Sequence, residues 1–130
     1  MILSFKPQFV KPILDGSKIH TIRLDPHNRW KAGAKIHFAT GIRTESYRQF
    51  MEGECKGVQK IEIKQGGKFS VWTWLVITIN GKGINEETFY KLCRNDGFGD
   101  TLDFENFFFP KKQNPKIFKG KIIHWTDFKY

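Results

Sequence analysis

The chain has 130 residues, of which 39% are hydrophobic and 15% aromatic, so it can build one core and does not have the composition of a disordered protein. Lysine and arginine number 22 against 13 aspartates and glutamates, giving a formal net charge of +9. A protein this basic attracts polyanions such as RNA or DNA, although the charge can also serve solubility alone.

The cysteine and apolar content narrows the class of protein further. Cys55 and Cys93 lack the spacing of a zinc site or of a disulfide framework, and no apolar run is long enough to cross a bilayer. The four histidines have no metal-ligand spacing either. We therefore expect one cytoplasmic domain over residues 1–130, a monomer that contacts no membrane and holds no metal or cofactor.

The first half of the chain predicts short strands and one irregular helix. Residues 7–16 place apolar side chains at helical spacing, but Pro12 falls inside them, so the helix is expected to be short or distorted and to end at Gly16. Residues 41–54 fit a helical turn or an anchored loop. Alternating, β-branched segments predict strands at residues 1–5, 18–23 and 35–40, with a polar turn at residues 25–28.

The second half predicts a hairpin, two helices and a final strand. Asp100 is a candidate cap for the second helix, which Pro110 would stop. The expected elements are strands at residues 58–64 and 70–80 with a turn at 65–67, a turn at 80–83, helices at 86–95 and 101–108 separated by a glycine-rich break, and a strand at 117–128. Together these elements predict an α+β fold around a small, closed sheet.

Two segments resemble a known family. Residues 13–23 read Ile-Leu-Asp-Gly-Ser-Lys-Ile-His-Thr-Ile-Arg and resemble the I-L-x-G-x-K-x-x-T-x-R signature of the ASCH family, a member of the PUA-like superfamily, and a K-x-G-type turn follows at residues 31–33. Residues 92–98 resemble the helix–acidic–Gly–Phe element of that family. The resemblance implies a small mixed β-barrel with short helices at its openings, and a cleft between the two elements.

The resemblance also implies site residues. Small bacterial N4-acetylcytidine amidohydrolases use a lysine, a threonine and a glutamate, which match Lys18, Thr21 and, with a shorter side chain, Asp96. The chain is longer than this family through residues 41–71. Residues expected to contact the ligand are Gly16, Ser17, His20, Arg23, Arg29, Trp30, Gly97 and Phe98.

The chemistry of these residues sets conditions on the fold. Regular strand alternation would put Lys18 and Thr21 on opposite faces, so both reach one cleft only if the chain turns near Ser17 or Ile19. A desolvated lysine can then serve as a base for a threonine nucleophile. Arg23 and Arg29 suit phosphate or a base edge, and their alternative is a surface ion pair with Asp25 or Glu86.

Two further side chains, one aromatic and one acidic, have predicted roles in the cleft. Trp30 can stack on a base, whereas the alternative is a core residue. Asp96 can orient the lysine amine or bind an exocyclic amide.

The leading hypothesis is binding of RNA or of a modified cytidine nucleoside in a basic cleft. The alternatives are hydrolysis of N4-acetylcytidine, RNA cleavage, and a protein-interaction module whose charge is incidental.

Overall fold

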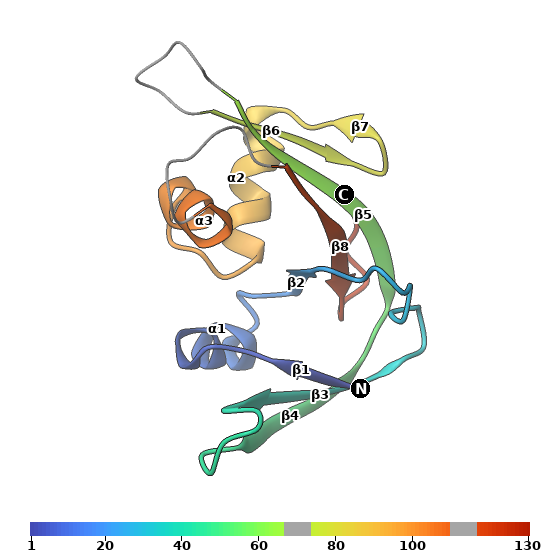
Figure 1. The fold of residues 1–130 in the computed structure, drawn as a ribbon, viewed down its shortest axis with the longest axis vertical. Coiled ribbons are helices and arrows are strands. Elements are labelled where there is room, and N and C mark those ends of the chain that lie inside the picture. The colour runs from blue at the N-terminus through green and yellow to red at the C-terminus, as the bar shows by residue number, and fades with distance from the viewer. Residues whose placement is uncertain (67–73, 110–116) are drawn as a thin grey trace.

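The computed structural model describes residues 1–66, 74–109 and 117–130, which form an α+β fold with two sheets and short helices. The sheet orders are β1-β3-β4 and β2-β8-β5-β6-β7 (Figure 1). The α+β class is therefore confirmed, and a closed barrel stays a prediction. In chain order the elements are β1 (Ile2–Ser4), the 3-10 helix η1 (Pro7–Phe9), α1 (Val10–Asp15), β2 (His20–Arg23), β3 (Lys35–Thr40), β4 (Arg48–Glu54), β5 (Gly57–Gly66), β6 (Trp74–Ile79), β7 (Lys82–Gly83), α2 (Glu86–Asn95), α3 (Thr101–Phe108) and β8 (Ile117–His124).

The chain passes from the smaller sheet to the larger one between β4 and β5. Cys55 donates its backbone N–H to Ala34, beside the smaller sheet, and the next residue, Lys56, donates to His124 in β8, both at 2.8 Å. Only β1 and β3 pair in parallel, and all other pairs in the described residues are antiparallel. Residues 48–66 are thus a nearly continuous extended segment that holds the two sheets together (Figure 1).

The larger sheet buries one face under helices. Helices α2 and α3 lie together on one side of this sheet (Figure 1). Alternate residues of its central strands are buried there, including Ile61, Ile63 and Ile77, together with Leu92 of α2 and Phe104 of α3. The residues between them in β5 point to the other face, and Lys60 and Lys64 are exposed.

Several elements follow the sequence-based prediction, and α2 and α3 have the predicted bounds. Asp100 caps α3 by accepting a hydrogen bond from the backbone N–H of Asp103 at 2.8 Å. Gly16 ends α1 in the left-handed conformation, with φ of 86°. The role predicted for Pro110 lies outside the described residues.

The prediction for residues 41–54 was wrong. Residues 48–54 form β4, which pairs with β3, rather than a helical turn or a loop. The register shifts between Phe38 and Ala39, whose partners are Met51 and Gln49, so that Phe50 has no partner in the ladder. A bulged residue interrupts the alternation of period two on which a strand prediction depends.

Other boundaries also differ from the prediction, and the predicted turn at residues 80–83 ends in strand β7 (Lys82–Gly83). Strand β2 begins at His20 instead of residue 18, and β8 ends at His124 instead of residue 128. The predicted turn at residues 65–67 is wrong at its start, because Gln65 pairs with Leu75 and the strand continues through Gly66. The connection between β5 and β6 lies outside the described residues.

Candidate functional site

A pocket of about 310 Å³ lies between the two sheets, where the ends of β1, β2 and α2 meet η1 and α3. It includes the lysine, the threonine and the carboxylate that the signature singles out. Its lining residues are Ser4, Phe5, Lys6, Phe9, Lys18, Thr21, Ile22, Arg23, Asp96, Phe98 and Phe107.

Asp96 is positioned by the C-terminus of α2. The backbone N–H of Phe98 donates to Cys93 and that of Gly97 donates to Arg94, both at 3.0 Å, which is the hydrogen-bond pattern of a Schellman motif. Gly97 has φ of 91°, as the left-handed residue of this motif requires. The motif ends the helix at Asp96 and directs both its carbonyl and its carboxylate toward the pocket.

Lys18 reaches the same point from the turn that follows α1. Its backbone N–H donates to Pro12 at 2.9 Å, and the next residue, Ile19, donates to Asn95 at 2.9 Å. The turn therefore packs against the end of α2 before β2 begins. The condition set by the odd spacing is met, because Lys18 lies outside the strand and shares the pocket with Thr21.

Gly97 also makes room for the lysine. A Cβ atom at this position would lie 2.9 Å from Cδ of Lys18 and 3.1 Å from Cδ1 of Phe9. A Cβ this close would force the lysine stem and the Phe9 ring to shift, so glycine is the residue that lets the lysine stem cross here without displacement. The signature residue Gly97 thus acts on the site through packing and lines no part of this pocket.

Lys18 and Asp96 form a buried ion pair. The lysine Nζ donates to the backbone carbonyl of Asp96 at 2.5 Å and to its Oδ1 at 3.1 Å, and the two side chains are only 3% and 4% exposed. Burial lowers the pKa of the Lys18 ammonium below its ordinary value, while the Asp96 charge and hydrogen bond oppose this shift. Burial is the larger effect, so this lysine gives up its proton more readily than a surface lysine.

Behind the pair, His20 connects Asp96 to Tyr130. Asn95 Nδ2 donates to the Tyr130 hydroxyl oxygen at 3.1 Å, and that hydroxyl lies 2.6 Å from His20 Nε2. Burial raises the pKa of the Tyr130 hydroxyl, which therefore stays protonated and donates a hydrogen bond to Nε2. The proton of His20 is then on Nδ1, which donates to Asp96 Oδ1 at 3.2 Å.

Gln59 fixes the position of Tyr130. Its Nε2 donates to the Tyr130 carbonyl and its Oε1 accepts from the Tyr130 backbone N–H, both at 2.9 Å. The same Oε1 lies 2.9 Å from His124 Nε2. Burial lowers the pKa of His124 to about 3, with a further contribution from the neighbouring His20. A neutral His124 donates from Nε2 to Gln59, which leaves its buried Nδ1 without a partner in the described residues.

Thr21 and Arg23 line the opposite wall. They are two residues apart in β2 and lie on the same face of that strand. The Arg23 Nε–H donates to Thr21 Oγ1 at 3.2 Å, and its terminal amine donates to the Ser4 carbonyl at 2.5 Å. The latter bond links the two sheets. No hydrogen bond joins Lys18 to Thr21 within the described residues, because the lysine is held by Asp96.

Three cations of the pocket lie over aromatic rings. Lys18 Nζ lies 4.8 Å from the centroid of the Phe9 ring, Lys6 Nζ lies 5.1 Å from Phe107, and the Arg23 guanidinium carbon lies 4.9 Å from Phe5. Each distance is within the range of a cation–π interaction. The lining residues carry three cations, Lys6, Lys18 and Arg23, and one carboxylate, so their formal charge is +3 − 1 = +2.

Of the predicted ligand contacts, His20 and Gly97 lie behind the pocket lining, and four others lie away from it. Gly16 and Ser17 are exposed, and the Ser17 hydroxyl and backbone N–H both donate to Asp15. Arg29 is exposed, and its backbone N–H and that of Trp30 donate to the Asp25 carboxylate at 2.8 and 3.1 Å.

For Arg23, Arg29 and Trp30, the sequence left a structural role open beside a role in binding. Trp30 packs against the core, which favours its structural interpretation. No ion pair joins Arg23 or Arg29 to Asp25 in the part of the chain that the structure describes, because Asp25 pairs with Lys121 at 3.0 Å. Glu86 instead accepts a hydrogen bond from the hydroxyl of a neighbouring tyrosine in α2.

Sequence reasoning missed several residues of the site. Tyr130 lies 110 positions from its partner His20, and no local pattern connects them. Phe5 and Phe9 stood out only as apolar residues of an expected strand and helix, and Phe107 only as the end of an expected helix. The position of Lys6, next to Pro7 at the start of a helix, was the one local signal for that cation.

The described residues provide neither a metal centre nor a membrane-spanning helix. Within residues 1–66, 74–109 and 117–130, no group of three or more histidine, cysteine, aspartate or glutamate side chains is arranged to bind a metal ion. None of the helices in these residues is both long enough and apolar enough to span a membrane. Comparison of the chain with models of protein families, with curated proteins and with solved structures finds no match.

Proposed function

We propose that the pocket binds RNA through one nucleotide, or binds a modified cytidine nucleoside, and that the chain is an ASCH-type domain of the PUA-like superfamily. The observation that carries the proposal is that three cations, four phenylalanine rings and one buried carboxylate line a single pocket. Aromatic faces stack on bases, and lysine and arginine bind phosphate, so this combination suits a nucleotide.

The size and polarity of the pocket support a ligand of this class. A volume of about 310 Å³ is at the small end of the range of small-molecule pockets and suits a nucleobase with part of its ribose. Asp96 Oδ1 accepts from Lys18 and His20, whereas Oδ2 accepts no hydrogen bond from the described residues. This oxygen can accept a hydrogen bond from the exocyclic nitrogen of a cytosine.

The arrangement of the sheets supports the family proposal. Strands β4 and β5 carry the chain from the smaller sheet to the larger one, as a PUA-like barrel would require. The pocket lies between the signature at residues 13–23 and the acidic–Gly–Phe element at residues 96–98, as the resemblance implies. Both cysteines are buried free thiols, which fits the cytosolic location that we propose.

Calorimetric titration with N4-acetylcytidine, and separately with a short single-stranded RNA at two salt concentrations, tests the proposal. Lys18→Ala should weaken binding of both ligands at least tenfold, because it removes a cation from the pocket wall. The matched control is Lys11→Ala, which removes one exposed lysine from α1. Equal affinity in the Lys18→Ala variant and the wild type would contradict the proposal.

A second function, amide hydrolysis of N4-acylated cytidine, is favoured by one observation, the buried Lys18 whose pKa is lowered and which lines the pocket with Thr21. In this reaction the Thr21 oxygen bonds to the acyl carbon and neutral Lys18 takes the hydroxyl proton. The C–N bond then breaks, the departing cytosine amine takes that proton from the lysine, and water hydrolyses the acyl–threonine ester. Lys18 must first leave Asp96, since it makes no hydrogen bond to Thr21.

Ultraviolet absorbance of N4-acetylcytidine incubated with the protein tests this second function. Hydrolysis predicts that cytidine appears and that Lys18→Ala and Thr21→Ala each abolish its appearance. Thr21→Ser keeps a hydroxyl and should retain turnover. Binding without turnover would leave the first proposal standing and would remove the second.

A further inference from the structure

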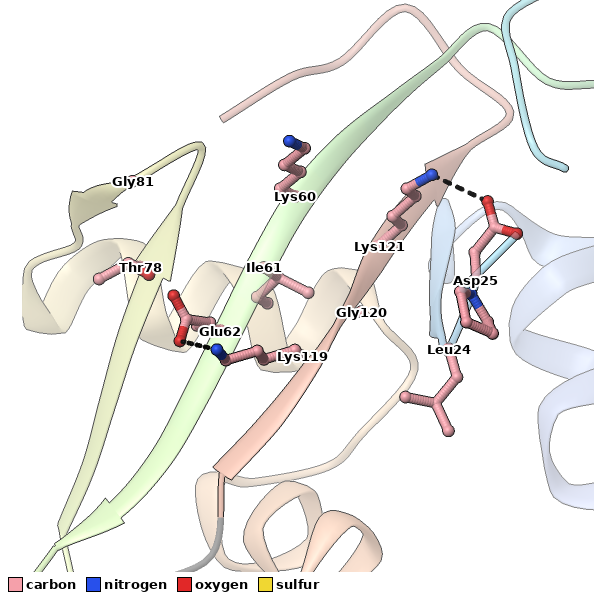
Figure 2. A pocket seen from close by; sticks show the side chains of 11 residues that line it. Leu24, Asp25, Lys60, Ile61, Glu62, Thr78, Gly81, Lys119, Gly120 and Lys121 are labelled. Carbon is pink, nitrogen blue, oxygen red and sulfur yellow. Dashed lines mark hydrogen bonds and ion pairs between the residues drawn. The ribbon is translucent and has the colours of Figure 1, made fainter. Parts of the chain in front are cut away.

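A second and larger cavity lies outside the pocket. It is a groove of about 510 Å³ on the face of the larger sheet that α2 and α3 do not cover, and its side chains project from β5, β8 and the segment after β2 (Figure 2). We call it the outer groove. Its lining residues are Leu24, Asp25, Pro26, Lys60, Ile61, Glu62, Thr78, Gly81, Lys119, Gly120 and Lys121.

Three lysine side chains, those of Lys60, Lys119 and Lys121, project from the neighbouring strands β5 and β8 on this face. Lys60 of β5 is directly opposite Lys121 of β8, and Glu62 of β5 is directly opposite Lys119 of β8. Like charges opposite each other on a sheet repel, so the pair of Lys60 and Lys121 is unfavourable without an anion nearby. Asp25 provides one such anion for Lys121 (Figure 2).

The acidic residues of the outer groove leave part of the lysine charge uncompensated. Asp25 is engaged by two backbone N–H groups and by Lys121, and it stabilises the turn after β2. Glu62 lies 3.8 Å from Lys119, whose side chain is 74% exposed, so this pair is weak. Lys60 makes no ion pair within the described residues. The formal charge of the lining is +3 − 2 = +1, and Lys64 adds a further cation on the same face.

One wall of the outer groove is apolar. Leu24 is 66% exposed, an unusual fraction for a leucine, and lies beside β8 (Figure 2); Pro26 also lines the outer groove. Between Lys119 and Lys121 the floor is formed by backbone, because residue 120 of β8 faces the other side of the sheet. An exposed apolar wall beside uncompensated cations complements a ligand that alternates flat apolar groups with anions.

The outer groove and the pocket share one segment of chain. Arg23, the last residue of β2, lines the pocket, and the next residue, Leu24, lines the outer groove. Arg23 also pairs with Lys121, which lines the outer groove. Consecutive side chains of an extended chain point to opposite faces, so an RNA that occupies both sites passes around the edge of the larger sheet at β2.

We infer that the outer groove binds the phosphate backbone of a single-stranded RNA, with Lys60 and Lys119 as phosphate contacts and Leu24 beside a base. This inference rests on the proposed function in one respect, that the RNA is the one whose nucleotide occupies the pocket. It makes the substrate a polymer rather than a free nucleoside.

The test compares two ligands and two double variants. Fluorescence anisotropy measures binding of an eight-nucleotide single-stranded RNA, and calorimetry measures binding of N4-acetylcytidine. The variant Lys60→Ala/Lys119→Ala removes two exposed lysines of the outer groove, and the matched control Lys11→Ala/Lys91→Ala removes two exposed lysines of α1 and α2. Both variants change the net charge equally, so long-range attraction is matched.

The inference predicts that Lys60→Ala/Lys119→Ala weakens RNA binding about tenfold or more relative to the control. Since each lost phosphate contact reduces the salt slope by about 0.7, the slope should fall by about 1.4. Binding of N4-acetylcytidine should not change.

The inference is overturned if the control variant loses as much RNA affinity as Lys60→Ala/Lys119→Ala, or if Lys60→Ala/Lys119→Ala binds RNA as tightly as the wild type. It is also overturned if the protein binds anionic lipid vesicles and does not bind RNA. Failure of the proposed function is recognised separately, because then Lys18→Ala changes the affinity of neither ligand. Binding of the nucleoside without binding of the RNA would overturn the groove and keep the pocket.

Discussion

The Asp96→Asn substitution tests the buried ion pair at the centre of the site. Asparagine has nearly the same shape, and its Oδ1 can still accept hydrogen bonds from Lys18 and His20. The negative charge is lost. The lysine ammonium then lies in a site where its side chain is 3% exposed, without a counter-charge.

The structure sets the size of the effect. With a distance of 3.1 Å between Nζ and Oδ1, Coulomb's law at an effective dielectric constant of about 20 gives roughly 5 kcal/mol. Loss of one partner of a buried pair costs about 3–5 kcal/mol in proteins. We therefore expect Asp96→Asn to lower the free energy of unfolding by about 3–5 kcal/mol at pH 7.

The loss should depend on pH in a defined direction. Without Asp96 the pKa of Lys18 falls further below its ordinary value, so the folded variant releases this proton before the unfolded chain does. Because the unfolded state then binds more protons, the stability of the variant rises with pH until about pH 10.5, the ordinary lysine pKa. The deficit relative to the wild type therefore shrinks between pH 7 and pH 10.

Urea unfolding, followed by tryptophan fluorescence at both pH values, measures these quantities. The double variant Lys18→Met/Asp96→Asn removes the buried cation as well and should recover most of the loss, which a double-mutant cycle quantifies. A deficit below about 1 kcal/mol at pH 7, or one equal at pH 7 and pH 10, would refute the reasoning.

Three further predictions concern the surroundings of the pair. Gly97→Ala should cost about 1–2 kcal/mol more than Gly16→Ala, because both glycines have positive φ but only the Cβ at residue 97 meets the Lys18 stem; equal losses in thermal unfolding would contradict this. Tyr130→Phe should lower the free energy of unfolding by about 1–3 kcal/mol in urea, since it leaves a buried imidazole nitrogen unpaired, and no loss would argue against that hydrogen bond. The stability of the wild type should fall between pH 6.5 and pH 3, because the unfolded chain protonates His124 while the folded chain keeps it neutral down to about pH 3; His124→Gln should flatten this dependence, and an unchanged slope would exclude His124 as its source.

Local sequence pattern was sufficient to predict those helices and strands whose conformation is decided by their own residues. The end of α2 was predicted from the glycine-rich break after it, where Gly97 ends the helix, and the structure adds Asn85 as the cap of its start. The strand at residues 35–40 follows from its alternation. Strand β4 was missed because the bulge at Phe50 depends on its pairing with β3, and no window of the sequence contains both strands.

The residues of the site also fall into two groups, those that a local motif selects and those that only the fold brings together. Lys18, Thr21, Arg23 and Phe98 could be selected because they belong to two short motifs, and the structure brings them to one pocket. Tyr130 could not be selected, because its contact with His20 arises only when β8 pairs with β2 and brings the following residues beside α2.

The outer groove could not be predicted for a related reason. Its lysines belong to β5 and β8, and their meeting depends on the register between the two strands. In the sequence, Lys119 and Lys121 form only a basic stretch, which also fits a solvated surface.

The most direct test of the central claim is an NMR titration of the nitrogen-labelled protein with N4-acetylcytidine. The account predicts saturable shifts of the backbone amides of Thr21, Gly97 and Phe98, and their loss in Lys18→Ala but not in Lys11→Ala. Absence of shifts at these amides up to millimolar ligand, with none on addition of single-stranded RNA, would contradict the claim that this pocket binds a nucleotide.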